Sequence, residues 1–285
     1  MRKKSILWLL LGLLFSFSAL AKETPKKMVK PKPIPPRILM IGDSHSVGIF
    51  GHKLTELIKT AAPKVELMAV ASCGSEPHWW LTGKPTHCGL RTLYPNGFDN
   101  TISNAPTPKI ADLLNLTKPK MTIVQLGSNL VLLSPQEREI YTQALMDIVK
   151  QNGGQCIWIS APDSRKFSSA DLQDVYAVLH TVLKKNSCKL IDSRKYTKYP
   201  STGGDGLHYG GQEGGVIATR WAEKVFNAGI KSTLEKTFKL TPEKKVLKTK
   251  EPEPKTIPKL KTELKKSTSQ PKTPVEKNHV HYKRK

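Results

Sequence analysis

Five short apolar runs, separated by stretches with helical spacing of apolar side chains, constrain the fold most. The runs are RILMIG (37–42), KVELMAVA (64–71), MTIVQLG (121–127), CIWISAP (156–162) and KLIDS (189–193). Strands that are apolar at consecutive positions suit a parallel sheet, because both of its faces are buried. Helices are predicted over 50–61, 135–151, 169–186 and 211–229. This alternation predicts an α/β fold, a three-layer α/β/α sandwich around a mostly parallel, five-stranded sheet.

The stretch between the second and third predicted strands, 72–120, interrupts the alternation. It is rich in Gly, Pro, Asn and Trp. Long connections without secondary structure of their own are often functional in compact domains. We therefore expect this stretch to be a long loop near the functional site.

Residues 1–21 have the composition of a signal peptide. Basic residues at 2–4 precede an apolar stretch from Ile6 to Leu20, and Ala19-Leu20-Ala21 offers a cleavage site. The apolar stretch is shorter than the ~20 residues that a membrane span needs, although an uncleaved anchor is the alternative. We expect a periplasmic or secreted protein whose mature chain begins near Lys22.

The positive charge is concentrated toward the two ends of the chain. The formal net charge is +23, of which residues 231–285 contribute +11 and residues 22–37 contribute +5. Both end segments are also rich in Pro and poor in residues that build a core. We predict a basic, Pro-rich linker over 22–36, one domain over 37–230, and a disordered basic tail over 231–285.

A basic tail of this kind suits an anionic envelope polymer or a membrane surface, and a solvated spacer without a partner is the alternative. No nucleic acid is expected as a partner, because aromatic side chains do not alternate with the basic ones.

The four cysteines, Cys73, Cys88, Cys156 and Cys188, allow three sets of disulfide pairs. We favour Cys73–Cys88, which would close one loop, and Cys156–Cys188, which would join the starts of two predicted neighbouring strands. Free buried thiols are the alternative, but exported proteins meet an oxidising environment that favours disulfides. No cysteine has the spacing of a zinc ligand, and we expect no metal.

Polar blocks follow the predicted strands, at the edge where parallel α/β sheets bind ligands. The first is GDSHS (42–46), where Ser44 begins a helix and its backbone N–H can stabilise an oxyanion. A serine hydroxyl needs a base before it can act as a nucleophile. His208 in DGLH (205–208) can supply that base, with Asp205 three residues earlier to orient the ring.

Two further groups can stabilise a tetrahedral intermediate. They are the backbone N–H of Gly74, in SCGS, and the side-chain amide of Asn129, in GSN (127–129).

Together the four blocks resemble those of the SGNH (GDSL-type) hydrolase superfamily, in the same order and over residues 37 to about 229. The resemblance implies a flavodoxin-like sandwich and an esterase, lipase, acetylesterase or acyltransferase without a metal or organic cofactor. It implies that Ser44 is the nucleophile, that His208 is the general base and then acid, and that Asp205 orients His208. The oxyanion hole would be formed by the N–H groups of Ser44 and Gly74 and by Asn129.

The sequence departs from the family pattern at two places. Leu130 stands where the third block often has Asp, although the amide donor Asn129 is present. The second block is a single glycine, so Gly83 and Gly89 are alternatives to Gly74.

Other residues are candidates for binding the substrate. They are His45 beside the nucleophile, Trp79 and Trp80 in the long loop, and Asp163 with Arg165 in APDSR. The tryptophans can stack on sugar rings or pack the loop onto the sheet, and Asp163 can contact substrate or cap a helix.

These observations lead us to expect a secreted serine esterase that removes O-acyl groups, O-acetyl groups in the first instance, from peptidoglycan or another envelope glycan. An O-acyltransferase that needs a donor partner is one alternative. A non-catalytic protein that binds an envelope polymer on the same scaffold is the other.

Overall fold

A computed structural model of the chain describes residues 35–240. The expected signal peptide, almost all of the linker and residues 241–285 of the expected tail lie outside the described residues.

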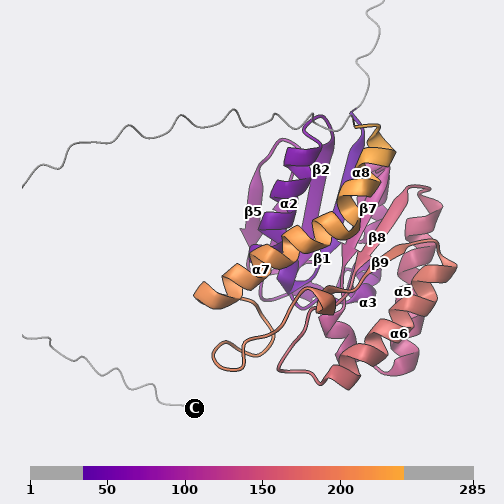
Figure 1. Ribbon diagram of the computed structural model, residues 1–285. Helices are drawn as coiled ribbons and strands as arrows, with labels where there is room; N and C mark the ends of the chain where they lie inside the picture. Colours follow the sequence, from indigo (N-terminus) through magenta and orange to yellow (C-terminus); the bar gives the residue numbers. More distant parts are fainter. Residues whose placement is uncertain (1–34, 241–285) are drawn as a thin grey trace, which may run out of the picture. The chain divides into compact units, whose positions relative to one another are not determined.

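A central sheet of seven strands organises this part of the chain, in the order β5-β4-β2-β1-β7-β8-β9 (Figure 1). The middle and one side of the sheet are parallel, and β4 and β5 run antiparallel. The parallel strands are β1 (Arg37–Gly42), β2 (Glu66–Ser72), β7 (Met121–Gln125), β8 (Gln155–Ile159) and β9 (Lys189–Ile191). All five predicted strands are therefore present, and the α/β sandwich with a mostly parallel sheet is confirmed.

Strand β1 shows why the sheet has helices on both faces. Ile38 and Met40 belong to one core cluster, whereas Leu39 and Ile41 belong to the other. Successive side chains of a strand point to opposite faces, so a run that is apolar throughout must be covered on both.

Two groups of helices provide this cover (Figure 1). The first face packs against α2 (Ile49–Ala61), α7 (Gly211–Val225) and α8 (Lys231–Phe238). The second face packs against α4 (Ile110–Thr117), α5 (Pro135–Gln151) and α6 (Ser169–Lys185). Both α5 and α6 begin with a capping box, formed by Ser134 with Glu137 and by Ser168 with Asp171.

The remaining elements are short. They are α1 (Ser44–Val47), α3 (Pro77–Thr82), the 3₁₀ helices η1 (Ser128–Leu132) and η2 (Ser193–Lys195), the π-helical turn η3 (Phe226–Ile230), and the strand pair β3 (Pro85–Thr86) with β6 (Ala105–Pro106).

The expected five-stranded sheet was wrong in the number of strands, because the stretch 72–120 is not simply a loop. It contains the hairpin of β4 (Leu90–Leu93) and β5 (Asp99–Ile102), which extends the sheet beyond β2. These strands carry no continuous apolar run, since β5 is exposed along its whole length. The residues PNG at 95–97, which are typical of a turn, were the sequence signal for this hairpin.

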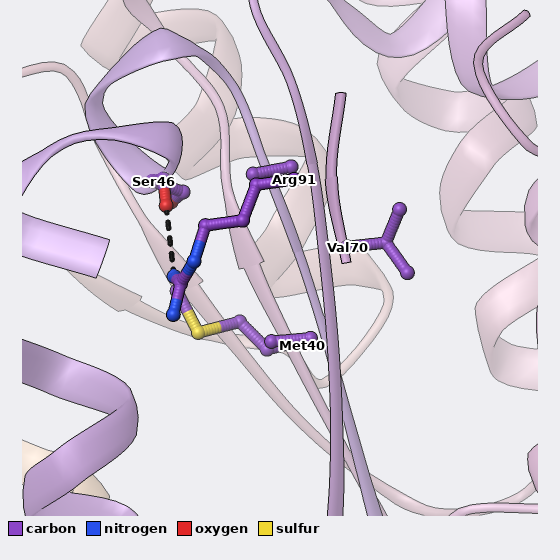
Figure 2. A pocket seen from close by; sticks show the side chains of 6 residues that line it. Met40, Ser46, Val70 and Arg91 are labelled. Carbon is purple, nitrogen blue, oxygen red and sulfur yellow. Dashed lines mark hydrogen bonds between the residues drawn. The ribbon is translucent and has the colours of Figure 1, made fainter. Parts of the chain in front are cut away.

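Arg91 of β4 fastens this hairpin to the segment after Ser44 (Figure 2). Its buried guanidinium donates to the carbonyl oxygen of Ser46 over 3.2 Å and to Thr55 Oγ1 over 3.3 Å. It also pairs with Asp99 of β5 at 2.6 Å. The hairpin is thus connected to α1 at Ser46 and to α2 at Thr55 through one side chain.

The domain also continues beyond the expected boundary at residue 230. Helix α8 covers Lys231–Phe238, and its Leu234 is fully buried in the core cluster that contains Trp221. The few apolar residues that make this contact do not stand out in a sequence segment, 231–285, that is rich in Lys.

Within residues 35–240, no helix is long and apolar enough to cross a membrane.

Candidate active site

Ser44 lies at the carboxyl end of β1, as the first residue of α1. Asp43 caps this short helix, with its Oδ1 accepting from the His45 N–H at 2.9 Å. Gly42 is needed for the tight turn, because a Cβ there would overlap the side chain of Ser46. Ser46 Oγ donates in turn to Gln125 Oε1 over 2.7 Å, which ties the turn to β7.

The structure brings Ser44, His208 and Asp205 into one hydrogen-bonded chain. His208 Nε2 lies 2.9 Å from Ser44 Oγ, although 164 positions separate the two residues. His208 Nδ1 lies 2.6 Å from Asp205 Oδ2. This is the relative geometry that a base and its orienting carboxylate need in order to activate a serine.

The second oxygen of Asp205 holds the loop itself in place. Asp205 Oδ1 accepts from the backbone N–H groups of His208 at 2.7 Å and Leu207 at 2.8 Å. Partial burial alone would raise the pKa of Asp205, but the hydrogen bonds from His208 and Leu207 outweigh it and hold the pKa well below its ordinary value. Asp205 therefore remains a carboxylate that can stabilise a positive charge on His208.

Tyr199, which the sequence analysis did not single out, stabilises this loop by hydrogen bonds. Its hydroxyl donates to the His208 carbonyl oxygen over 3.0 Å and accepts from the Gly206 N–H over 3.1 Å. It also lies 3.4 Å from Asp205 Oδ1. No motif marks a tyrosine six residues before the aspartate, so only the three-dimensional contacts identify it.

Asp163, which is half-buried, and Arg165, which is exposed, both contact the segment that leads to His208. Asp163 Oδ2 accepts from the Tyr199 N–H at 2.8 Å. The Arg165 guanidinium donates to the carbonyl oxygens of Pro200 at 3.0 Å and Gly203 at 2.6 Å. These contacts hold the His208 loop against the segment after β8, and the expected contact of Arg165 with substrate stays a prediction.

The three expected oxyanion donors come from three neighbouring strand ends. Ser44 follows β1, Gly74 follows β2 and Asn129 follows β7. In the described part of the chain, the N–H groups of Ser44 and Gly74 donate to no protein acceptor. Asn129 Nδ2 donates to the Ser75 carbonyl oxygen over 3.0 Å, which couples it to the segment carrying Gly74. The alternatives, Gly83 and Gly89, lie at the end of α3 and just before β4.

His45 is only 4% exposed and lies in the wall of the cavity beside Ser44 and His208. Its contact with substrate stays a prediction. Its ring packs edge-on against Trp221, and its Nε2 lies 3.2 Å from Ser128 Oγ. Burial, with the nearby His208, lowers the pKa of His45 to about 3, so the ring stays neutral. His45 therefore shapes the floor of the site and cannot take part as a charged group.

The two tryptophans of the long segment have different environments, because consecutive helical residues point about 100° apart. Trp80 is fully buried in the second core cluster, with its Nε1 donating to Ser75 Oγ over 3.1 Å. It cannot stack on a substrate. Trp79 is half-buried beside Gly74, and the Lys84 ammonium lies 4.9 Å from its ring.

A cavity of about 290 Å³ opens beside Ser44 and His208. Its walls are mainly apolar and come from α1, α2, α7 and both Cys73 and Cys88. The cysteines form the disulfides Cys73–Cys88 and Cys156–Cys188, which are the pairings that we favoured. Within residues 35–240, no three His, Cys, Asp or Glu side chains are grouped as metal ligands.

Comparisons with known proteins agree with this arrangement at the level of the fold. No protein-family model and no curated protein matches the chain. The crystal structure of TesA matches with a TM-score of 0.51 and 15% identity, over 70% of this chain and 99% of TesA. The esterase EstA from Pseudoalteromonas sp. matches with a TM-score of 0.50 and 13% identity, over 70% of this chain and 98% of EstA. Residues 35–240 therefore have an SGNH hydrolase-like fold.

Proposed function

We propose that the chain is a serine ester hydrolase that works through an acyl-enzyme. The observation that carries this proposal is the chain of hydrogen bonds from Asp205 through His208 to Ser44, at the carboxyl ends of the parallel strands. The EstA structure supports it, because that protein is an esterase and was inhibited by monoethylphosphonate.

In this reaction His208 Nε2 takes the proton of Ser44 Oγ, which attacks the ester carbonyl carbon. The oxyanion that forms is stabilised by the N–H groups of Ser44 and Gly74 and by the Asn129 amide. His208 then gives its proton to the departing alcohol oxygen, leaving Ser44 acylated. A water molecule, deprotonated by His208, attacks the acyl-enzyme, and collapse of the second intermediate releases the acid and restores Ser44.

We further propose that the substrate is an O-acetyl ester on an envelope glycan. The cavity of about 290 Å³ lies at the small end of the range for ligand pockets, so it suits a short acyl group. Trp79 offers a half-buried aromatic face beside Gly74, on which a sugar ring can stack. Two disulfides are typical of an exported protein, which would meet such a glycan.

Two measurements test the proposal. A fluorophosphonate probe should label the folded wild-type protein at Ser44, and Ser44→Ala should abolish the labelling. Acetate should be released from O-acetylated peptidoglycan by the wild-type protein and not by Ser44→Ala. Absence of labelling in a folded sample would contradict a serine hydrolase and favour a polymer-binding protein.

The products distinguish the remaining alternatives. Acetylated sugar acceptor in place of free acetate would indicate acyl transfer. Activity restricted to long-chain lipid esters would contradict the O-acetyl substrate while leaving the ester hydrolase in place.

A further inference from the structure

The Cys73–Cys88 disulfide lies in the wall of the reaction cavity, together with Ser44 and His208. Cys73 directly follows β2, and Cys88 precedes β4. The other disulfide, Cys156–Cys188, joins the beginning of β8 to the residue before β9. In a parallel sheet, strand beginnings lie at the edge opposite the strand ends, so this second disulfide is remote from the site.

Gly74 is held directly against the first disulfide. Its φ is +81°, and a Cβ at this position would lie 4.0 Å from Cys88 Sγ and 3.5 Å from the Trp79 ring. The left-handed backbone conformation favours glycine at this position, and the first disulfide and the Trp79 ring lie beside it.

The direction of the Gly74 N–H is fixed through the same group of residues. This N–H belongs to the peptide unit whose carbonyl oxygen is that of Cys73, and in a planar trans peptide the two groups point in opposite directions. Thr86 Oγ1 donates to the Cys73 oxygen over 2.8 Å and accepts from the Cys88 N–H over 3.3 Å. Thr86 is fully buried, and both bonds are partly buried.

We propose that the Cys73–Cys88 disulfide is a positioning element for the oxyanion donor Gly74, and that its reduction slows ester hydrolysis reversibly. The inference rests on the proposed ester hydrolase activity. A dithiol supplies two electrons and two protons, so the S–S bond breaks, Cys73 and Cys88 become thiols, and the dithiol becomes a disulfide.

The two disulfides differ in how easily a reductant reaches them. Cys88 is exposed and Cys73 is half-buried at the cavity, whereas Cys156 is half-buried and Cys188 is only 5% exposed. Exchange requires a thiolate to approach a sulfur atom, so a small dithiol reduces the cavity disulfide first.

The central test compares two double variants of the full chain with the wild-type protein on a small acetate ester. Cys73→Ser/Cys88→Ser should lower kcat by about 10- to 100-fold, approaching the loss of one oxyanion donor, with KM changed less than about threefold. The matched control, Cys156→Ser/Cys188→Ser, should keep kcat within about twofold.

A measurement of Tm for both variants distinguishes a positioning role of the Cys73–Cys88 disulfide from a general loss of stability. The control disulfide closes the longer segment, with a sequence separation of 32 against 15, so its loss should lower Tm at least as much. A structural role alone would therefore reduce activity at least as strongly in the control. Equal kcat losses in both variants, or an unchanged kcat in Cys73→Ser/Cys88→Ser, would overturn the inference.

A second measurement covers the case in which Cys73→Ser/Cys88→Ser does not fold. Cys156→Ser/Cys188→Ser retains only the cavity disulfide, so dithiothreitol should expose two thiols and lower kcat by the same factor, with an unchanged circular dichroism spectrum. Reoxidation should restore kcat. Full activity with both thiols titrated would contradict the positioning role, whereas an oxidised wild-type protein that neither hydrolyses the ester nor reacts with fluorophosphonate would contradict the proposed function itself.

Discussion

Asp43, the residue before the nucleophile, shows how strongly burial acts on single groups in this protein. Its side chain is fully buried, and within residues 35–240 its Oδ2 has no hydrogen-bond partner. Burial raises the pKa of Asp43 to about 7, although the hydrogen bond from the His45 N–H opposes the rise. The neutral carboxylic acid is therefore the form that the fold favours.

This shift predicts a pH-dependent stability. In the unfolded chain Asp43 ionises near 3.8, whereas in the folded protein it keeps its proton up to a pH of about 7. As pH rises through this window the unfolded state binds fewer protons, so the free energy of unfolding should fall, by up to about 4 kcal/mol in total. The contribution of the neutral form is complete below 3.8 and lost above about 7.

Asp43→Asn removes the titrating group and keeps an oxygen that can accept from the His45 N–H. Urea unfolding of both proteins at several values between pH 4 and 7 should therefore show a shallower decline for the variant. Parallel profiles for the wild-type protein and Asp43→Asn would show that Asp43 ionises normally.

Asp205→Asn tests the orienting carboxylate. The amide cannot stabilise the imidazolium that forms when His208 takes the Ser44 proton, so kcat should fall by about 10²- to 10³-fold. The loss should be at the lower end of such effects, because the Asp205 side chain is 54% exposed and solvent screens its charge. Steady-state hydrolysis of a small acetate ester measures kcat. A decrease in kcat of less than about tenfold would mean that Asp205 only holds the loop in place.

At the scale of elements, α8 is part of the domain and contributes to its core. Leu234 is fully buried, and Phe238 and Leu240 pack against the same core cluster. Helix α8 follows α7 through the π-helical turn η3, so the C-terminal helical segment covers one face of the sheet as a continuous layer (Figure 1).

Leu234→Ala should lower the free energy of unfolding by about 2–5 kcal/mol, through lost apolar burial and the cavity that remains. Lys236→Ala, at an exposed position of the same helix, is the control and should change it by no more than about 0.5 kcal/mol. Chemical denaturation measures both variants. Similar values for the two would mean that α8 does not contribute to the core in solution.

At the scale of the whole molecule, the positive charge is concentrated toward the C-terminal end of the sequence. Residues 241–285 contain 14 Lys or Arg and 5 Glu, a net charge of +9. We propose that this segment attaches the protein to an anionic envelope surface, where the hydrolase domain meets its substrate.

The full chain should therefore co-sediment with vesicles that contain an anionic lipid, and a chain ending at residue 240 should bind much less. Raising the salt concentration from about 0.1 to 1 M shortens the Debye length from about 10 to 3 Å and should release the full chain. Both chains should hydrolyse a small soluble ester equally. Salt-independent binding, or equal binding of the two chains, would contradict an electrostatic attachment.

The sequence by itself predicted the parallel sheet, the pairing of Ser44 with His208, and the positions of Gly74 and Asn129 after neighbouring strands. Apolar runs report burial on both faces, and the ends of parallel strands lie at one edge, so the blocks that follow them meet without any knowledge of side-chain contacts. The Cys156–Cys188 pair was favoured by the same strand order, and the Cys73–Cys88 pair because it closes one loop.

Only the tertiary structure decided which nearby side chains face the cavity. Trp80 turns into the core, whereas His45 lies almost fully buried in the cavity wall. Arg165 and Tyr199 hold the His208 loop, and Arg91 ties an unpredicted hairpin to the turn after Ser44. These roles depend on contacts between residues far apart in the chain, whereas local patterns record only the spacing of neighbours. The burial and the hydrogen-bond partners of a site residue are set by segments that meet only in the folded protein, so the sequence of one segment does not show them.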